Sequence, residues 1–246
     1  MSSGTVKIGK RSKKQDGNFG YEKSFRSFVP ELQKMEPKER IALKSEELFM
    51  QYGIRSVSMD DIANNLGMSK KTLYQYFADK DELVEAVVER HINMVEGDCI
   101  NCQREATDAI HEIFLTMKHI MEEFKNMNPM LLYDLEKFHF KAYQRFKDYK
   151  DKFLLEVIQK NIEWGIKDGL YRPDLNIDVL SKYRIESIMI PFNVAVFPPG
   201  KYNLAMTSEI MIDNFTYGLA SIKGHKLIQK YYEQHKKISS YEESKK

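Results

Sequence analysis

A run of hydrogen-bonding side chains occupies residues 70–76 of this 246-residue chain. Its members are Lys70, Lys71, Thr72, Tyr74, Gln75 and Tyr76. Ammonium and amide groups match the hydrogen-bonding pattern of base edges, and lysine and hydroxyl groups also bind phosphate oxygens. The chemistry that this run offers is recognition of duplex DNA. Lys71 and Gln75 are the predicted base readers. Tyr76 is expected at a phosphate, and packing is an alternative role for Tyr74.

Three further residues stand where helices are expected to begin. Ser58 and Ser69 are residues of the type that caps helix N-termini, and Lys80 follows a third such residue. The free N–H groups at a helix N-terminus attract phosphate. We therefore expect Ser58, Ser69 and Lys80 to lie near phosphates of bound DNA.

Apolar residues at helical spacing indicate the elements that position these groups. Two short helices are predicted, separated by a turn at Gly67, where glycine permits a left-handed conformation. Their apolar positions are Ile62, Ala63, Leu66, Leu73 and Phe77. A longer helix, from about Pro37 to Tyr52, is expected to brace the pair. This is the layout of a helix-turn-helix, whose second helix enters the major groove.

From Arg40 to about His91, the chain resembles the DNA-binding domain of the tetracycline-repressor (TetR) family of bacterial regulators. The residues that carry the resemblance read LFMQYGIRSVSMDDIANNLGMSKKTLYQYFADKDEL. The resemblance implies a three-helix DNA-binding domain, linked by a fourth helix to a larger helical domain that binds an effector and dimerises. The fourth helix is expected to begin after Asp79 and to run to about Cys99. A two-fold dimer implies a palindromic double-stranded DNA operator.

The bulk composition is that of an ordinary globular protein, with 42% hydrophobic and 30% charged residues. The formal net charge is only +2, so an attractive field for DNA must come from where the lysines are placed. No apolar run reaches the length of about 18 residues that a membrane span needs. Two cysteines are too few for a disulfide framework, and no signal peptide is evident. These features predict a cytoplasmic protein that contacts no membrane.

Helical patterns continue beyond the DNA-binding segment, so the predicted fold class is all-α. Helices are expected near 110–124, from Asn128, over 143–167, over 178–191 and over 203–219. The predicted organisation is a basic, disordered extension over 1–35, a helix-turn-helix domain over 36–90, an effector and dimerisation domain over 91–222, and a polar tail over 223–246. Three roles are open for residues 1–34: a DNA-tracking arm, an interaction tail, or a functionally minor extension, which we favour.

The region between about 110 and 165 is crowded with methionine and aromatic residues. Methionine adapts to irregular space, so such a region can line a pocket for an apolar or amphipathic ligand. Simple filling of the core is the alternative. The candidate effector-binding residues are Met117, His119, Met121, Phe124, Tyr133, Phe138, His139 and Trp164. The helices near 178–191 and 203–219 carry more apolar residues than one buried face needs, which predicts a homodimer.

Three spacings suggest other chemistry. Cys99 and Cys102 form a C-x-x-C pair, interpreted here as two ordinary thiols. The pairs Asp108-x-x-His111 and Glu136-x-x-His139 resemble the ligands of di-iron bundles, but the two additional inward carboxylates are not evident. No catalytic triad, phosphate loop or zinc-protease motif is present. We expect no enzyme activity, cofactor or metal; a di-iron oxygenase is the remote alternative.

The function predicted from these patterns is sequence-specific regulation of transcription. The protein is expected to be a repressor that a small apolar or amphipathic ligand releases from its operator. The alternative is a DNA-binding regulator that responds to a protein partner and binds no small molecule. A sizeable apolar cavity would favour the first, and a tightly filled core would favour the second.

Overall fold

A computed structural model describes residues 35–243 of the chain, and the regular structure of that part is helical throughout. Two isolated bridges, Tyr171 with Ala220 and Pro199 with Tyr202, are the only strand-like pairings it shows there. The predicted all-α fold is thus confirmed. The interpretations offered for residues 1–34 fall outside the described part. No helix among the described residues is long and apolar enough to cross a membrane.

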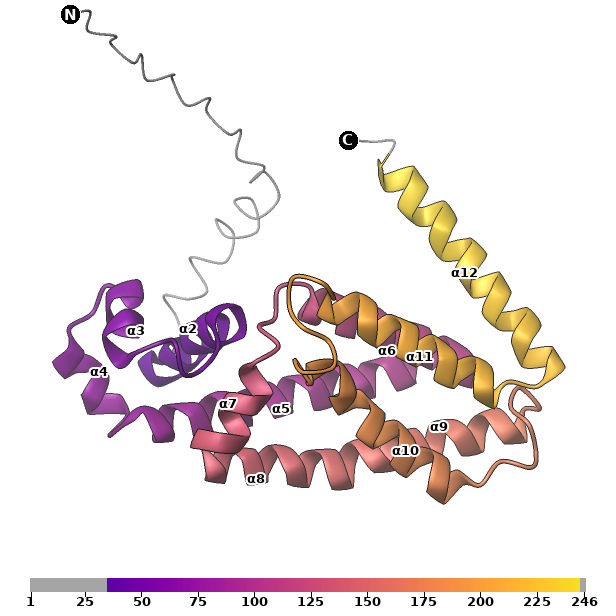
Figure 1. Cartoon of the computed structure of the whole chain (residues 1–246), viewed down its shortest axis with the longest axis horizontal. Coiled ribbons are helices and arrows are strands. Elements are labelled where there is room, and N and C mark those ends of the chain that lie inside the picture. The colour runs from indigo at the N-terminus through magenta and orange to yellow at the C-terminus, as the bar shows by residue number, and fades with distance from the viewer. Residues whose placement is uncertain (1–34, 244–246) are drawn as a thin grey trace, which may run out of the picture. The chain divides into compact units, whose positions relative to one another are not determined.

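The chain divides into Met1–Arg40 and Ile41–Lys246, and the contacts below all lie within the second unit. Its first helices are α2 (Pro37–Tyr52, which begins before the division), α3 (Met59–Leu66), α4 (Lys70–Tyr76) and α5 (Lys80–Glu105). Figure 1 shows α3 and α4 in succession before the long α5. The predicted helix-turn-helix is therefore present.

Local sequence signals explain where α3 begins and ends. The Ser58 side chain accepts a hydrogen bond from the Asp61 backbone, and the Asp61 carboxylate accepts one from the Ser58 backbone. This capping box satisfies two N–H groups that the first turn leaves free. Gly67 then adopts a left-handed conformation, with φ of 64°, and its N–H closes the helix end.

The remaining elements form the larger helical part of the chain (Figure 1). They are α6 (Ala109–Phe124), α7 (Leu131–Phe138), α8 (Phe140–Tyr149), a π-helical segment η1 (Lys150–Leu154), α9 (Leu155–Lys167), α10 (Ile177–Met189), a 3-10 segment η2 (Ile190–Phe192), α11 (Leu204–Leu219) and α12 (Ile222–Glu243). Two buried clusters result. One gathers the helix-turn-helix residues with Leu135 and Ala142, and the other joins α6, α9, α11 and α12.

Two helices differ from the sequence prediction. The fourth helix continues to Glu105 rather than Cys99, and it stops where Asp108 caps α6 by accepting from Ile110 and His111. The single helix expected over 143–167 is interrupted by η1. Apolar periodicity could not show this interruption, because a π-bulge inserts one residue without changing the residue types.

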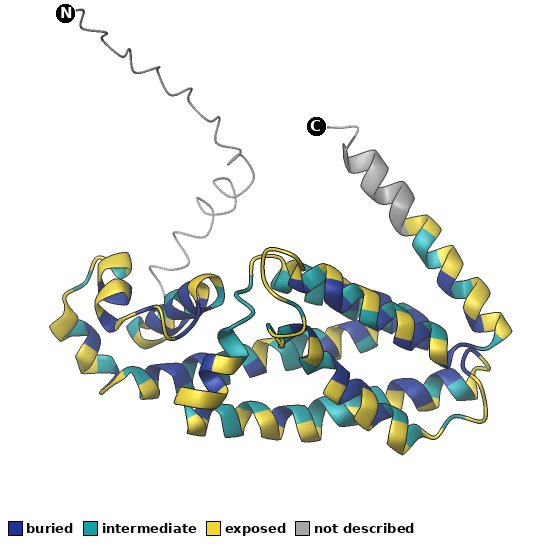
Figure 2. Cartoon of the chain, in the orientation of Figure 1, coloured by how far each residue is buried: buried dark blue, intermediate teal, exposed yellow. Residues whose placement is uncertain are grey.

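Residues 223–246 are expected to form a polar tail, and the described part of this region lies in the 22-residue helix α12. Its first turns dock firmly, since Ile228 is buried and Gly224 lies against the backbone of Leu170. A Cβ at Gly224 would lie 2.0 Å from the Leu170 carbonyl oxygen, so only glycine allows this approach. The expected domain boundary at residue 90 falls inside α5 and stays a prediction. Figure 2 shows buried residues along both halves of this helix.

Candidate DNA interface and internal cavity

The helix α4 presents one face to the protein and the other to solvent. Leu73 is 0% exposed and anchors the inner face, and Ser69 caps the helix by accepting from the Thr72 N–H at 3.1 Å. Lys71, Tyr74 and Gln75 lie exposed on the outer face. The outer face therefore carries an ammonium, a phenol and an amide, the groups that read base edges and phosphates.

The other candidates on α4 already have partners within the protein. The Lys70 ammonium pairs with Asp60 at 2.8 Å, and the Thr72 hydroxyl lies 2.8 Å from that of Ser69. Tyr76 is half-buried and packs against the helix-turn-helix cluster. Exposed ion pairs contribute little to stability, so Lys70 remains free to exchange Asp60 for a phosphate.

Ser58 and Lys80 have structural contacts in the free protein. The Ser58 hydroxyl donates to Asp61, and this bond lowers the pKa of the Asp61 carboxyl. The Lys80 ammonium donates to the Ile54 carbonyl at 2.6 Å and lies over the Phe49 ring. Burial lowers the pKa of Lys80. A phosphate contact by Lys80 stays a prediction, and it requires this ammonium to turn outward.

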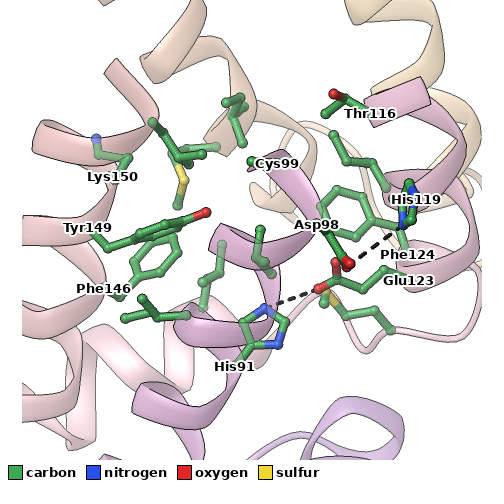
Figure 3. Close-up of a pocket in the computed structure, with 18 of the residues that line it drawn as sticks. His91, Asp98, Cys99, Thr116, His119, Glu123, Phe124, Phe146, Tyr149 and Lys150 are labelled. Atoms are coloured by element: carbon green, nitrogen blue, oxygen red, sulfur yellow. Dashed lines mark ion pairs between the residues drawn. The ribbon is translucent and has the colours of Figure 1, made fainter. Parts of the chain in front are cut away.

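An internal cavity of about 260 Å³ lies in the helical part of the chain. Its wall is mainly apolar, and residues of α2 and of α5 to α11 contribute to it. Of the eight candidate effector residues, Met117, His119 and Phe124 line this cavity. Figure 3 shows His119 and Phe124 on the same side of it.

The other five candidates lie elsewhere. Met121 and Trp164 pack against the second buried cluster. Tyr133 and Phe138 are exposed, and His139 is paired with Asp81 at 2.5 Å. Periodicity placed four of these residues on helices correctly, whereas His139 lies between α7 and α8. It could not indicate which face of each helix borders the empty space.

A polar cluster at the cavity wall was not anticipated from the sequence. His91 Nδ1 lies 2.9 Å from Glu46, and His91 Nε2 lies 3.2 Å from Glu123. Glu46 also pairs with Arg90. Figure 3 shows the His91 ring directed at Glu123. The cluster connects α2, α5 and α6. The feature of the sequence that could have indicated it is a histidine among the apolar residues of α5.

The protonation of His91 follows from two opposing effects. Burial alone would lower its pKa, but hydrogen bonds to Glu123 and Glu46 outweigh burial and raise the pKa to about 9. His91 is therefore a cation at neutral pH. A charged residue with a carboxylate on each side stabilises the joint between the three helices.

Two further polar residues of the wall are less well matched. The Tyr149 hydroxyl is buried without a hydrogen-bond partner among the described residues, and burial raises its pKa. Arg184 is 9% exposed and donates to the Ser187 hydroxyl at 3.2 Å. Both residues line the cavity. Tyr149 and Lys150 lie together on the side of the cavity opposite His119 (Figure 3).

The residues considered for metal or redox chemistry have ordinary structural roles. Burial raises the pKa of the Cys99 thiol to about 12, so the reactive thiolate is not populated at neutral pH. Asp108 caps α6 and accepts from the Tyr231 hydroxyl at 2.6 Å. Among the described side chains, those of residues 35–234, no group of three histidine, cysteine or acidic residues is arranged for a metal ion.

Comparison with known proteins agrees with this geometry. Residues 43–87, which hold the helix-turn-helix, match the family model for bacterial regulatory proteins of the tetR family. The helix-turn-helix segment therefore matches the TetR family. It is 33% identical over 131 residues to the uncharacterized HTH-type transcriptional regulator YvaF of Bacillus subtilis, an alignment that covers 52% of this chain and 62% of YvaF.

Solved structures of regulators from other bacteria share the fold of this chain. The ketosteroid transcriptional regulator KstR2 of Mycobacterium tuberculosis superposes with a TM-score of 0.54 at 15% identity, covering 76% of this chain and 96% of KstR2. A TetR-family regulator from Marinobacter aquaeolei VT8 gives a TM-score of 0.62 at 15% identity, covering 81% and 98%. Such low identities establish the fold alone. The relatives are named as regulators of transcription and not as enzymes.

Proposed function

We propose that this protein is a DNA-binding transcriptional repressor whose affinity for its operator falls when an apolar or amphipathic ligand fills the cavity. The observation that carries the proposal is the composition of the cavity wall. Phe49, Met50 and Ile54 line the cavity and also belong to the segment that braces the helix-turn-helix. A ligand therefore contacts the DNA-binding segment directly.

The helix α5 provides a second connection between cavity and DNA-reading helices. Leu83 and Val84, near its start, are fully buried in the helix-turn-helix cluster. His91 and Cys99, two and four turns further along, line the cavity. A ligand that displaces the cavity wall therefore moves α5, whose N-terminal end packs in the helix-turn-helix cluster. Such a ligand changes the affinity for DNA only if it binds the DNA-binding arrangement of the helices and the released arrangement with different affinities.

Direct contacts outside α5 also join the two parts. The Met50 carbonyl accepts from the Asn128 N–H at 2.6 Å, and the Asp134 carboxylate accepts from the Arg55 N–H at 2.9 Å. These bonds attach the loop before α7 to the C-terminal end of α2, and α7 itself to the segment between α2 and α3. The proposed DNA-binding domain (36–90) and effector domain (91–222) are thus in contact at more than one place.

Exposed apolar side chains support dimerisation through α10 and α11. On α10, Val179 and Tyr183 are 57% and 53% exposed, and on α11, Met206 and Ile210 are 62% and 59% exposed. Their spacing of four residues puts each pair on one helix face. Burial of such faces against a second copy would give a two-fold dimer and a palindromic operator.

The cavity favours this proposal over regulation by a protein partner, for which a filled core was expected. The test has two steps. Sequences bound by the purified protein are first selected from random DNA, which yields the operator. A thermal-shift screen of amphipathic compounds then supplies ligands, and each is tested for operator release. A palindromic consensus and ligands that both stabilise the protein and release DNA are expected; stabilisation without release would refute the ligand response.

A further inference from the structure

Arg184 is a buried cation without a matching anion. Its guanidinium lies over the Phe215 ring, 5.6 Å from the ring centroid, and donates one hydrogen bond, to the Ser187 hydroxyl. Among the side chains that the structure describes, those of residues 35–234, no carboxylate lies within ion-pair distance of it. A guanidinium has five N–H donors, so most of its hydrogen-bonding capacity is unused.

The other cationic or titratable nitrogen groups of the cavity wall lie beside carboxylates, which makes Arg184 an exception. His91 pairs with two carboxylates, and Lys150 pairs with Glu186 at 2.7 Å. Asp98 lies 3.7 Å from His119. Buried charges in proteins are ordinarily paired, because an unpaired charge in an apolar environment is costly. Arg184 is therefore the one cation of the described cavity wall that has no carboxylate partner, and the buried Glu112 carboxylate, which accepts from Asn161, is the one acid there without a cation.

Loss of the proton does not resolve this imbalance. Burial lowers the pKa of Arg184, but only to about 10, so the side chain stays cationic at neutral pH. A hydrophobic residue of similar length could fill the same space without this cost. The positive charge is thus available to an anion that enters the cavity.

The surroundings of Arg184 limit the class of anion. A planar guanidinium binds a carboxylate through two parallel hydrogen bonds. A phosphate dianion would need a second free cation, and the nearest lysine of the wall, Lys150, is already neutralised by Glu186. The remaining wall is mainly apolar. A single negative charge on a hydrocarbon body matches these features.

We propose that the cavity binds an amphipathic carboxylate, whose head group accepts hydrogen bonds from Arg184 while its hydrocarbon part lies along the apolar wall. This assignment rests on the proposed function, since it names the ligand class of the same cavity. It adds a specificity-determining residue and predicts discrimination between ligands that differ only in their charge.

The test compares decanoate with decan-1-ol by titration calorimetry on the full-length protein. The two probes share one hydrocarbon chain and differ in the head group. Because a hydrogen bond to a charged group is stronger than a neutral one, decanoate should bind the wild type about 10- to 100-fold more tightly. Arg184→Met should abolish this preference and change decan-1-ol affinity less than about threefold. The control Arg172→Met, at an exposed arginine, should behave as wild type.

Each contrary result has a distinct meaning. Equal affinities in the wild type, or a preference that survives Arg184→Met, would overturn the assignment and leave the ligand response intact. No binding of either probe would overturn the assignment, and the ligand screen would then decide the proposed function separately. Preferential binding of decanoate without operator release would support this assignment and refute the proposed function.

The unliganded variant gives an independent check on the role of Arg184. Methionine removes an unpaired buried charge, so Arg184→Met should unfold at the same temperature as wild type or at a higher one. A lower unfolding temperature, by more than about 5 °C, would show that Arg184 stabilises the fold itself, which contradicts the assignment.

Discussion

The helix-turn-helix region and the region around the cavity differ in how completely side chains fill the space between their helices. Leu73, Phe77 and Leu83 are fully buried in the helix-turn-helix cluster, and the short helices α3 and α4 have side-chain caps. Around the cavity, Tyr149 and Arg184 lack full partners, and a π-helical segment interrupts the wall. A filled cluster moves as one body, whereas a wall with open space can adopt two arrangements.

Truncation of a buried side chain should therefore lower the stability of the protein far more in the helix-turn-helix cluster than at the cavity wall. Leu73→Ala is expected to lower the free energy of unfolding by about 2–5 kcal/mol, because it leaves a void in a filled cluster. Ile188→Ala, at a half-buried residue of the wall, should cost less than about 2 kcal/mol, since space already exists beside it. Chemical denaturation measures both. Equal costs would mean that the two interiors are packed alike.

The polar cluster around His91, which connects α2, α5 and α6, should make the stability of the protein depend on pH. Because the pKa is raised from 6.5 to about 9 in the folded protein, the contribution of His91 is fully present below pH 6.5 and is lost as the pH rises through 9. Its size is up to about 3 kcal/mol. The difference in unfolding free energy between wild type and His91→Gln should therefore shrink from pH 6 to pH 9.

Denaturation at several pH values tests this expectation. His119→Gln is the matched control, because His119 is exposed and lies 3.7 Å from its only acidic partner among the described residues. That variant should follow the wild-type pH profile. A difference between wild type and His91→Gln that stays constant across the range would contradict the assigned role of the joint.

The outer face of α4 should affect DNA binding and leave stability unchanged. Gln75→Ala is expected to cost about 1–3 kcal/mol in binding to the selected operator and to relax the sequence preference, because an amide that reads a base edge is lost. Gln51→Ala, an exposed amide on α2, is the control. An unchanged consensus for Gln75→Ala would remove Gln75 from the base readers.

The smallest expected effect is at Tyr149. Tyr149→Phe removes a buried hydroxyl that has no partner, so the unliganded protein should keep its stability or gain up to about 1 kcal/mol. The thermal unfolding profile of the variant measures this. A loss of more than about 1 kcal/mol would mean that the hydroxyl has an unrecognised partner, and the contrast between the filled and unfilled regions would weaken.

The two regions also differ in how well the sequence predicted them. The capping box at Ser58, the turn at Gly67 and the apolar spacing of α3 and α4 are local signals, and the structure confirms the helix-turn-helix that they predict. The cavity depends on contacts between helices distant in sequence. Periodicity identified Met117 and Phe124 as inward residues, but it could not show that Trp164 packs against the second buried cluster while Arg184 borders open space.

The central claim is that the occupant of the cavity sets the affinity for DNA, and one variant tests it directly. Val157 lines the cavity, and Val157→Phe should fill part of it. Operator affinity is measured with increasing amounts of the tightest ligand from the screen, for wild type and variant. Wild-type affinity should fall by about 5- to 150-fold, and the variant should bind operator unchanged throughout. Equal release of both proteins, or a wild type that binds ligand and keeps its full operator affinity, would contradict the claim.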